Sequence, residues 1–144
     1  MILESNGHFA MIDTGDDFSY PDGSNPRYPD RPGIEKDPKA ITEDRLFAHI
    51  KQLGIKSFDF IIITHAHSDH VGGAHDILKT IPTKTIYIKK YSDDRITDKT
   101  GLWDNLYGYE RALQAALETN TTIIQDISEK DSHLTLGNIT IDLL

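Results

Sequence analysis

The stretch Phe58-Asp59-Phe60-Ile61-Ile62-Ile63-Thr64-His65-Ala66-His67-Ser68-Asp69-His70-Val71-Gly72-Gly73 decides the fold of this chain. Its first part is an apolar run with the length and composition of a buried strand. Its second part holds three histidines and one aspartate within six positions. The sequence therefore predicts a strand that delivers a cluster of metal-ligand side chains to a loop at its carboxyl end.

The spacing within this cluster predicts two groups of ligands. His65 and His67 stand two positions apart on an extended segment, where alternate side chains share a face, so we expect their imidazoles to converge on one cation. Asp69 and His70 follow as the chain turns, and we expect them to reach a second cation. Zinc accepts imidazole nitrogen and carboxylate oxygen, and manganese and iron accept similar sets. The alternative is a solvated, histidine-rich loop.

The segments before the cluster predict a hairpin, a loop and a helix. Asn6-Gly7, between apolar runs at 1–4 and 8–13, is typical of a two-residue hairpin turn. Residues 16–39 are polar and rich in proline, which predicts a long loop that is either a solvated insertion or part of a substrate cleft. Apolar residues at helical spacing between Thr42 and Gly54 predict a helix.

The segments after the cluster predict alternating helices and strands. Helices are expected at about 74–79 and 104–118, strands at 58–64, 85–88 and 122–125, and a hairpin at 134–143. This order favours an α/β (α+β) fold with a mixed sheet and covering helices. Apolar strands run up to both ends of the sequence, so residues 1–144 are expected to form a single, truncated domain.

Composition narrows the possible partners. The formal net charge of −8 disfavours non-specific binding to nucleic acid or to an anionic membrane. No run approaches the roughly 18 apolar residues that a membrane span needs, and no secretory signal pattern is visible in these residues. Cysteine is absent, which limits any metal site to His, Asp, Glu and similar ligands.

The ligand cluster resembles the first metal motif of the metallo-β-lactamase superfamily, His-X-His-X-Asp-His followed by a small or glycine pair. Four residues match that motif position by position: His65, His67, Asp69 and His70. Asp13-Thr14-Gly15 resembles a turn that family members carry close to the metal centre. The resemblance implies the N-terminal half of an αββα sandwich and two divalent metal ions, with Zn²⁺ as the expected ion. Asp13 would fix a ligand imidazole from behind; a purely turn-forming role is its alternative.

Residues 3–11, 89–93 and 102–109 further resemble the catalytic modules of teichoic acid phosphorylcholine esterases, a family of choline-binding proteins of the bacterial surface. This resemblance implies a phosphodiester hydrolase that releases phosphorylcholine from teichoic or lipoteichoic acid. The implied partner is a choline-bearing cell-wall polymer or a small phosphodiester, and the implied location is secreted or at the cell surface. Asp69 is the expected catalytic residue, because it would orient the attacking hydroxide.

An aromatic group precedes and enters the predicted helix at 104–118. Aromatic faces attract quaternary ammonium ions by roughly 0.5–2 kcal/mol per contact, so Trp103 and Tyr107 are candidate substrate-binding residues. Core packing is the alternative for both. Tyr109 shares the helical spacing of apolar neighbours and is expected in the core.

The superfamily completes its two-metal site with a bridging aspartate and a later histidine, which these 144 residues do not supply. We therefore expect half of a binuclear site and little or no activity from this fragment alone. Two alternatives stay open. One is another hydrolase of the same fold, of the nuclease, lactonase or thioesterase type. The other is a metal-binding fragment without catalysis.

Overall fold

The computed structural model describes residues 1–16, 20–28, 30, 41–97 and 104–143. Its elements, in chain order, are β1 (Ile2–Ser5), β2 (His8–Ile12), α1 (Ile41–Gln52), β3 (Phe58–Ile63), α2 (Ser68–Val71), α3 (Ala74–Thr80), β4 (Thr83–Ile88), α4 (Asn105–Glu118), β5 (Thr122–Ile124), β6 (His133–Leu136) and β7 (Ile139–Asp142). Short 3₁₀ helices, η1 (Asp93–Arg95) and η3 (Glu129–Asp131), precede α4 and β6.

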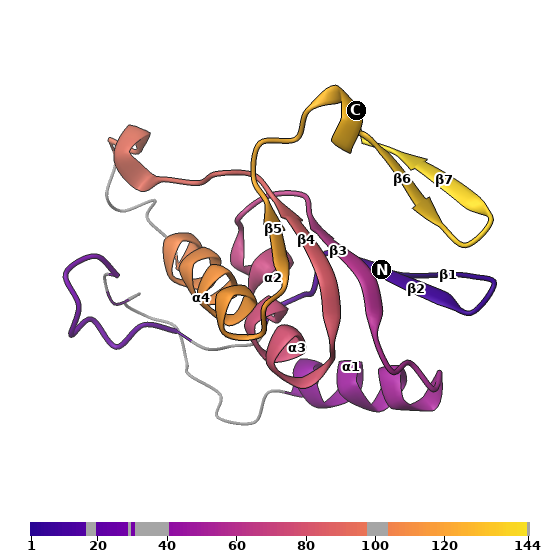
Figure 1. The fold of residues 1–144 in the computed structure, drawn as a ribbon. Helices are drawn as coiled ribbons and strands as arrows, with labels where there is room; N and C mark the ends of the chain where they lie inside the picture. Colours follow the sequence, from indigo (N-terminus) through magenta and orange to yellow (C-terminus); the bar gives the residue numbers. More distant parts are fainter. Residues whose placement is uncertain (17–19, 29, 31–40, 98–103, 144) are drawn as a thin grey trace.

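The main sheet has five strands in the order β1-β2-β3-β4-β5 (Figure 1). β1 and β2 are antiparallel, and β2, β3, β4 and β5 run parallel to one another. One row of the register crosses four strands, through Met11, Ile61, Ile86 and Ile123. The prediction of a mixed sheet with covering helices is confirmed.

The two faces of the sheet bury two separate apolar clusters, because side chains alternate along each strand. On the helix face, Ile61 and Ile86 pack with Ile77 of α3 and Ala112 of α4. On the other face, Ala10, Phe60 and Ile62 pack with Leu134 and Leu136 of the β6–β7 hairpin. Each fully buried Ile or Leu side chain contributes roughly 1.5–3 kcal/mol, so both layers hold the sheet in place.

Two predicted hairpins are present, and they meet. The first turns at Asn6 and Gly7, whose φ angles of 53° and 78° are those of the predicted turn. The tip of the β6–β7 hairpin rests on the end of β1, where Asn138 N–H donates to Ser5 Oγ at 3.0 Å. A Cβ at Gly137 would lie 2.1 Å from Ser5 O, so only glycine fits there.

The structure differs from the prediction most at the start of β4 and in the turn after β3. β4 begins at Thr83 rather than Thr85, because Thr83 pairs with Phe58 and the Phe58 N–H donates to Pro82 O at 2.9 Å. The turn after β3 includes a short helix, α2, that the sequence pattern did not separate. Most of the predicted loop at 16–39 lies outside the described residues. Among the residues that are described, no helix has the length and apolarity to cross a membrane.

Candidate metal centre

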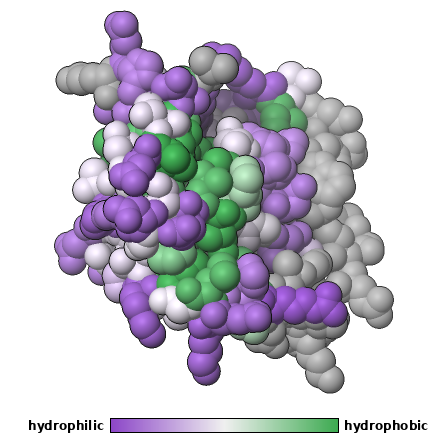
Figure 2. Space-filling view, turned by 90° about the vertical axis from the view of Figure 1, so that its right-hand side faces the viewer, coloured by the Kyte–Doolittle hydropathy of each residue, from purple (hydrophilic) through white to green (hydrophobic). Residues whose placement is uncertain are grey.

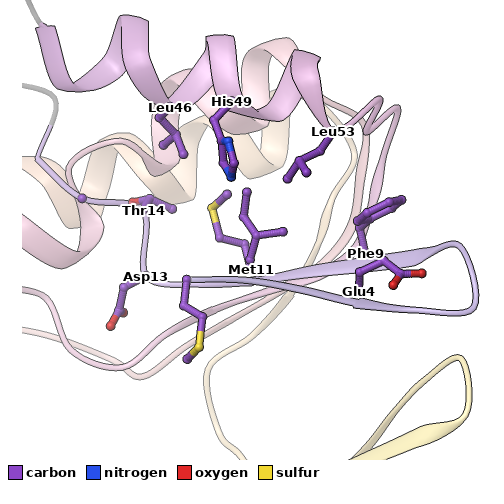
Figure 3. Close-up of a pocket in the computed structure, with 11 residues that line it drawn as sticks. Glu4, Phe9, Met11, Asp13, Thr14, Leu46, His49 and Leu53 are labelled. Carbon is purple, nitrogen blue, oxygen red and sulfur yellow. The ribbon is translucent and has the colours of Figure 1, made fainter.

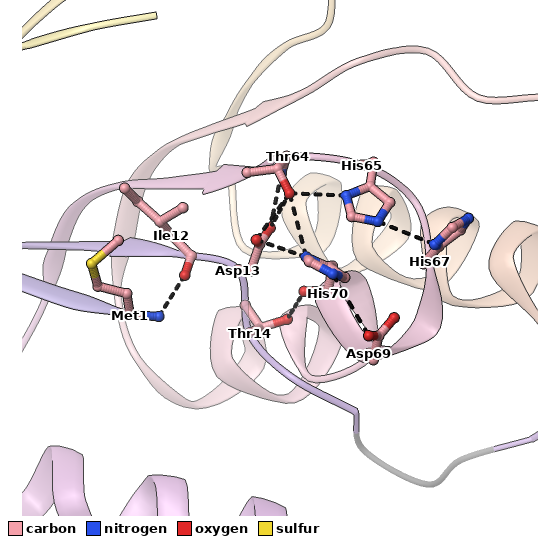
Figure 4. Close-up of polar contacts among 9 residues, drawn as sticks. All are labelled: Met1, Ile12, Asp13, Thr14, Thr64, His65, His67, Asp69 and His70. Carbon is pink, nitrogen blue, oxygen red and sulfur yellow. Dashed lines mark hydrogen bonds and ion pairs between the residues drawn. The ribbon is translucent and has the colours of Figure 1, made fainter.

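The centre forms where β2 and β3 end. These strands are parallel neighbours, so the residues that follow them, Asp13 and Thr64, emerge at the same edge of the sheet. Asp13 still donates its backbone N–H to Ile62 O at 2.9 Å. It then turns with φ at 54°, a left-handed conformation that aspartate tolerates better than most residues. This turn directs the carboxylate toward Thr64 (Figure 4).

The turn after β2 is locked to the junction of α2 and α3. The backbone N–H and the hydroxyl of Thr14 both donate to His70 O, at 2.8 and 2.9 Å. The Gly73 N–H donates to Gly15 O at 2.9 Å. A Cβ at Gly73 would lie 2.8 Å from Thr14 O, which requires glycine at this contact. The position of His70 relative to β2 is therefore set by backbone contacts.

The four predicted ligands lie in two adjacent pairs (Figure 4). His65 Nε2 and His67 Nδ1 are 3.1 Å apart. His70 Nε2 lies 3.6 Å from Asp69 Oδ2, and the rings of His65 and His70 are 3.8 Å apart between centroids. The Asp69 side chain is 71 % exposed and that of His70 is 31 % exposed, so the second pair opens to solvent.

Asp13 supports the second pair from behind. Its Oδ2 accepts from His70 Nδ1 at 2.8 Å, and its Oδ1 accepts from the Thr64 backbone N–H at 2.8 Å. Burial raises the pKa of the Asp13 carboxyl, but hydrogen bonds from Thr64 and His70 outweigh burial and hold the pKa below its ordinary value. Because His70 uses Nδ1 for this bond, its Nε2 is left for a metal.

The sequence matches the family model of the metallo-beta-lactamase superfamily over residues 1–133. The chain belongs to the metallo-beta-lactamase superfamily. It is also 32% identical, over 115 residues and 79% of its length, to ComE operon protein 3 of Bacillus subtilis (strain 168). The chain spans 12% of the length of that relative.

Members of the metallo-beta-lactamase superfamily are typically hydrolases, and they usually bind divalent metals. The sequence-based resemblance to this superfamily is confirmed. Neither match is to a phosphorylcholine esterase, so the narrower resemblance stays a prediction. That residues 1–144 form a single, truncated domain also stays a prediction.

The donor chemistry of the four residues fits a divalent metal such as zinc, because imidazole nitrogen and carboxylate oxygen are ordinary zinc ligands. The fit is partial. Zinc takes four protein ligands in structural sites and three with a water in catalytic sites, whereas each pair supplies two. Within the described part of the chain, no group of three or more His, Asp or Glu side chains is arranged around one point. Further donors are needed to complete either position.

Three other histidines pair with carboxylates elsewhere in this superfamily domain. His133 Nδ1 lies 2.7 Å from Asp142 on the β6–β7 hairpin. His8 meets Asp59 at 2.7 Å, and His75 meets Asp76 at 2.9 Å. Each of these three histidines therefore pairs with a carboxylate other than Asp13 and Asp69.

The aromatic candidates divide between described and undescribed residues. Trp103 lies outside the described residues. Tyr107 is half-buried in α4, and its ring meets that of Tyr28 edge-on, 5.4 Å apart, beside a pocket of about 260 Å³. The next residue, Gly108, faces α2, where an added Cβ would lie 3.1 Å from Val71 Cγ1. Tyr109 is buried in the core, as predicted.

Two contributors to the site were missed by sequence reasoning, Thr64 and Tyr28. Thr64 directly precedes His65 at the strand end, and that position was the available signal for it. Tyr28 belongs to the long loop, and its hydroxyl donates to Glu110 of α4. Burial, and after it Glu110, raises the pKa of the Tyr28 phenol. No pattern in the loop indicates which residue contacts α4.

A larger hollow of about 760 Å³ borders the centre, between the β1–β2 hairpin and α1 (Figure 3). Apolar side chains, including Phe9, Met11 and Leu46, make most of its wall. Figure 2 shows an apolar strip, framed by hydrophilic residues, on the side of the molecule that is at the right of Figure 1. The hollow reaches Asp13 but is lined by none of the four predicted ligands.

Proposed function

We propose that this protein is a metal-dependent phosphodiester hydrolase. The observation that carries the proposal is the pairing of His65 with His67 and of Asp69 with His70, with Asp13 bonded to His70 from behind. Two pairs on one loop suit two cations, and two-metal sites are typical of phosphoryl transfer and hydrolysis. Superfamily membership is consistent with hydrolysis but leaves the substrate open.

Each side chain has a role that follows from its position. His65 and His67 would hold one cation, and Asp69 and His70 the other. Bound cations supply a nucleophile from water at neutral pH and neutralise charge on phosphoryl oxygens. Asp69 is the more exposed carboxylate, so it is placed to accept a hydrogen bond from the attacking water. Asp13 keeps His70 oriented through Nδ1.

The narrower proposal is a phosphorylcholine ester as substrate, released from a choline-bearing polymer at the cell surface. Support comes from the pocket where Tyr28 and Tyr107 stand edge-on and Asp22 adds a carboxylate. Aromatic faces and a carboxylate attract a quaternary ammonium. A net charge of −8 repels polyanions at long range but not a zwitterionic headgroup.

The experiment uses the protein at its full natural length, loaded with zinc, on a panel of substrates. The panel holds p-nitrophenylphosphorylcholine, bis-p-nitrophenyl phosphate, single-stranded DNA, a lactone and a thioester. Turnover of any of the three phosphodiesters, removed by EDTA and restored by zinc, supports the proposal. A preference for the choline ester that Tyr107→Ala abolishes, with the other diesters unaffected, supports the narrower form.

A matched pair of histidine variants makes the test specific. His67→Ala should lower turnover by more than about 100-fold, because removing a ligand costs more than the 10–100-fold typical of its outer partners. His133→Ala, whose imidazole pairs with Asp142 on the far hairpin, should leave turnover unchanged. Hydrolysis of the lactone or thioester alone would overturn the phosphodiester proposal. Bound zinc without any turnover would indicate a metal-binding protein that is not an enzyme.

A further inference from the structure

The Thr64 hydroxyl lies at the centre of the candidate site and contacts both ligand pairs (Figure 4). It is 3.0 and 2.9 Å from the two carboxylate oxygens of Asp13. It is 3.0 Å from His65 Nδ1 and 3.4 Å from His70 Nδ1. One small polar group thus touches a histidine from each pair and the carboxylate that backs one of them.

The hydrogen-bonding capacity of these groups permits one arrangement. A hydroxyl has a single hydrogen to donate, and a carboxylate can only accept. The Thr64 hydrogen therefore points to Asp13. Toward His65, Thr64 Oγ can then only accept, so His65 must carry its hydrogen on Nδ1. The lone pair of His65 is consequently on Nε2, the nitrogen that faces His67 at 3.1 Å.

The same reasoning applies to the second pair. His70 Nδ1 faces the Asp13 carboxylate at 2.8 Å, so it must donate, and its lone pair is on Nε2, toward Asp69. In both histidines the lone pair is on Nε2, because Nδ1 carries the hydrogen and donates it to Asp13 or to a group bonded to Asp13. For His65 this bond passes through the Thr64 hydroxyl.

We propose that Thr64 is a positioning residue that fixes the Nδ1–H tautomer of His65 and, through Asp13, links it to the tautomer of His70. The two metal positions would then be prepared together, before any cation binds, by one hydroxyl and one carboxylate. Outer partners of this kind orient ligand imidazoles and raise metal affinity. The purpose of these tautomers rests on the proposed function, because they would serve metal binding. The tautomers themselves are tested in the metal-free protein.

The test reads the tautomer directly. The full-length protein, labelled with ¹⁵N-histidine and freed of metal with EDTA, is studied by long-range ¹H–¹⁵N correlation at a pH well above the ordinary imidazole pKa of about 6.5. The unchanged protein should show His65 and His70 protonated on Nδ1. His133, which also bonds a carboxylate through Nδ1, serves as an internal reference in every spectrum.

Two variants of Thr64 distinguish the effect of its hydroxyl from the effect of its side-chain shape. Thr64→Val keeps the shape and the backbone N–H bond to Asp13 but has no hydroxyl, so His65 should lose its fixed Nδ1–H tautomer. Zinc affinity should fall about 10–100-fold. Thr64→Ser restores the hydroxyl and should restore both readouts. Melting of each variant in EDTA reports whether the fold is intact.

Several outcomes would overturn the inference. His65 protonated on Nε2 in the unchanged, metal-free protein refutes it even if the valine variant fails to fold. A valine variant with an unchanged His65 spectrum and unchanged zinc affinity also refutes it, as does failure of serine to restore them. If the tautomers and zinc affinities of all three proteins are as expected but the unchanged, zinc-loaded protein turns over no phosphodiester, the proposed phosphodiesterase fails and the role of Thr64 stands.

Discussion

Replacing Gly73 by alanine tests whether the close contact between the α2–α3 junction and the turn after β2 holds the candidate ligands at 65–70 in place. The added Cβ would lie 2.8 Å from Thr14 O, where ordinary contact begins at 3.4 Å. The two segments must therefore separate by about 0.6 Å, the difference between those distances. Gly73 has φ at −72°, so alanine brings no backbone strain of its own.

The magnitude follows from three terms. Overpacking costs about 1–3 kcal/mol. The Gly73–Gly15 hydrogen bond, now 2.9 Å, would lengthen past useful range and lose about 0.5–1.5 kcal/mol. Reduced freedom of the unfolded chain offsets about 0.4–1 kcal/mol. The expected net loss is about 0.5–4 kcal/mol, or roughly 2–13 °C in Tm for a domain of this size.

Metal affinity should fall with stability, because the same separation moves Asp13 away from His70. Urea unfolding in EDTA measures the first effect, and zinc titration of the folded protein measures the second, with a loss of roughly tenfold expected. Gly54→Ala is the control. Its Cβ meets nothing within 4 Å but its φ is +70°, so it should lose stability and keep its zinc affinity. A Gly73→Ala protein with wild-type stability and zinc affinity would refute the reasoning.

Two further substitutions test the sheet. Gly137→Ala should destabilise the protein by about 2–4 kcal/mol, since its Cβ would lie 2.1 Å from Ser5 O at a φ of +54°. Gly7→Ala, with positive φ but open space, should cost less in the same urea titration, and equal midpoints would contradict the docked hairpin. Burial raises the pKa of the Asp59 carboxyl, but hydrogen bonds from Lys84 and His8 lower it by more. The pKa of Asp59 therefore lies below its ordinary value. The lowered pKa stabilises the fold above the unfolded pKa of about 3.9, and this stability is lost as pH falls through the folded value. Asp59→Asn should therefore be less stable than wild type at pH 7, with the gap closing as pH falls through the lowered pKa of Asp59; a gap independent of pH would argue against this pairing.

The fold was largely predictable because its signals are local. Asn6-Gly7 marks a turn by the conformations it allows, and the run at 58–63 marks a buried strand by its apolar side chains. The helix at Asn105–Glu118 follows from apolar spacing. Boundaries were less predictable, as at Thr83, because strand length depends on the neighbour that pairs with it.

The candidate site was only partly predictable, because its supports come from distant segments. The ligand spacing lies within six residues and is visible in the sequence. The hydroxyl of Thr64 gains its role from Asp13, which is 51 positions away. Tyr28 gains its role from Glu110, 82 positions away. Contacts at such separations leave no periodic pattern, so they emerge only when the sheet brings the segments together.

The link between the ends of β2 and β3 has a consequence for how this protein can vary. The chain between Asp13 and Thr64 is a closed loop, and the entropy of closing a loop grows only with the logarithm of its length. Doubling that loop would cost about 0.6 kcal/mol, comparable to one ordinary hydrogen bond. Insertions and deletions before α1 can therefore accumulate with little effect on the ligands. The length of this segment can thus vary while the arrangement of the four candidate ligands is kept.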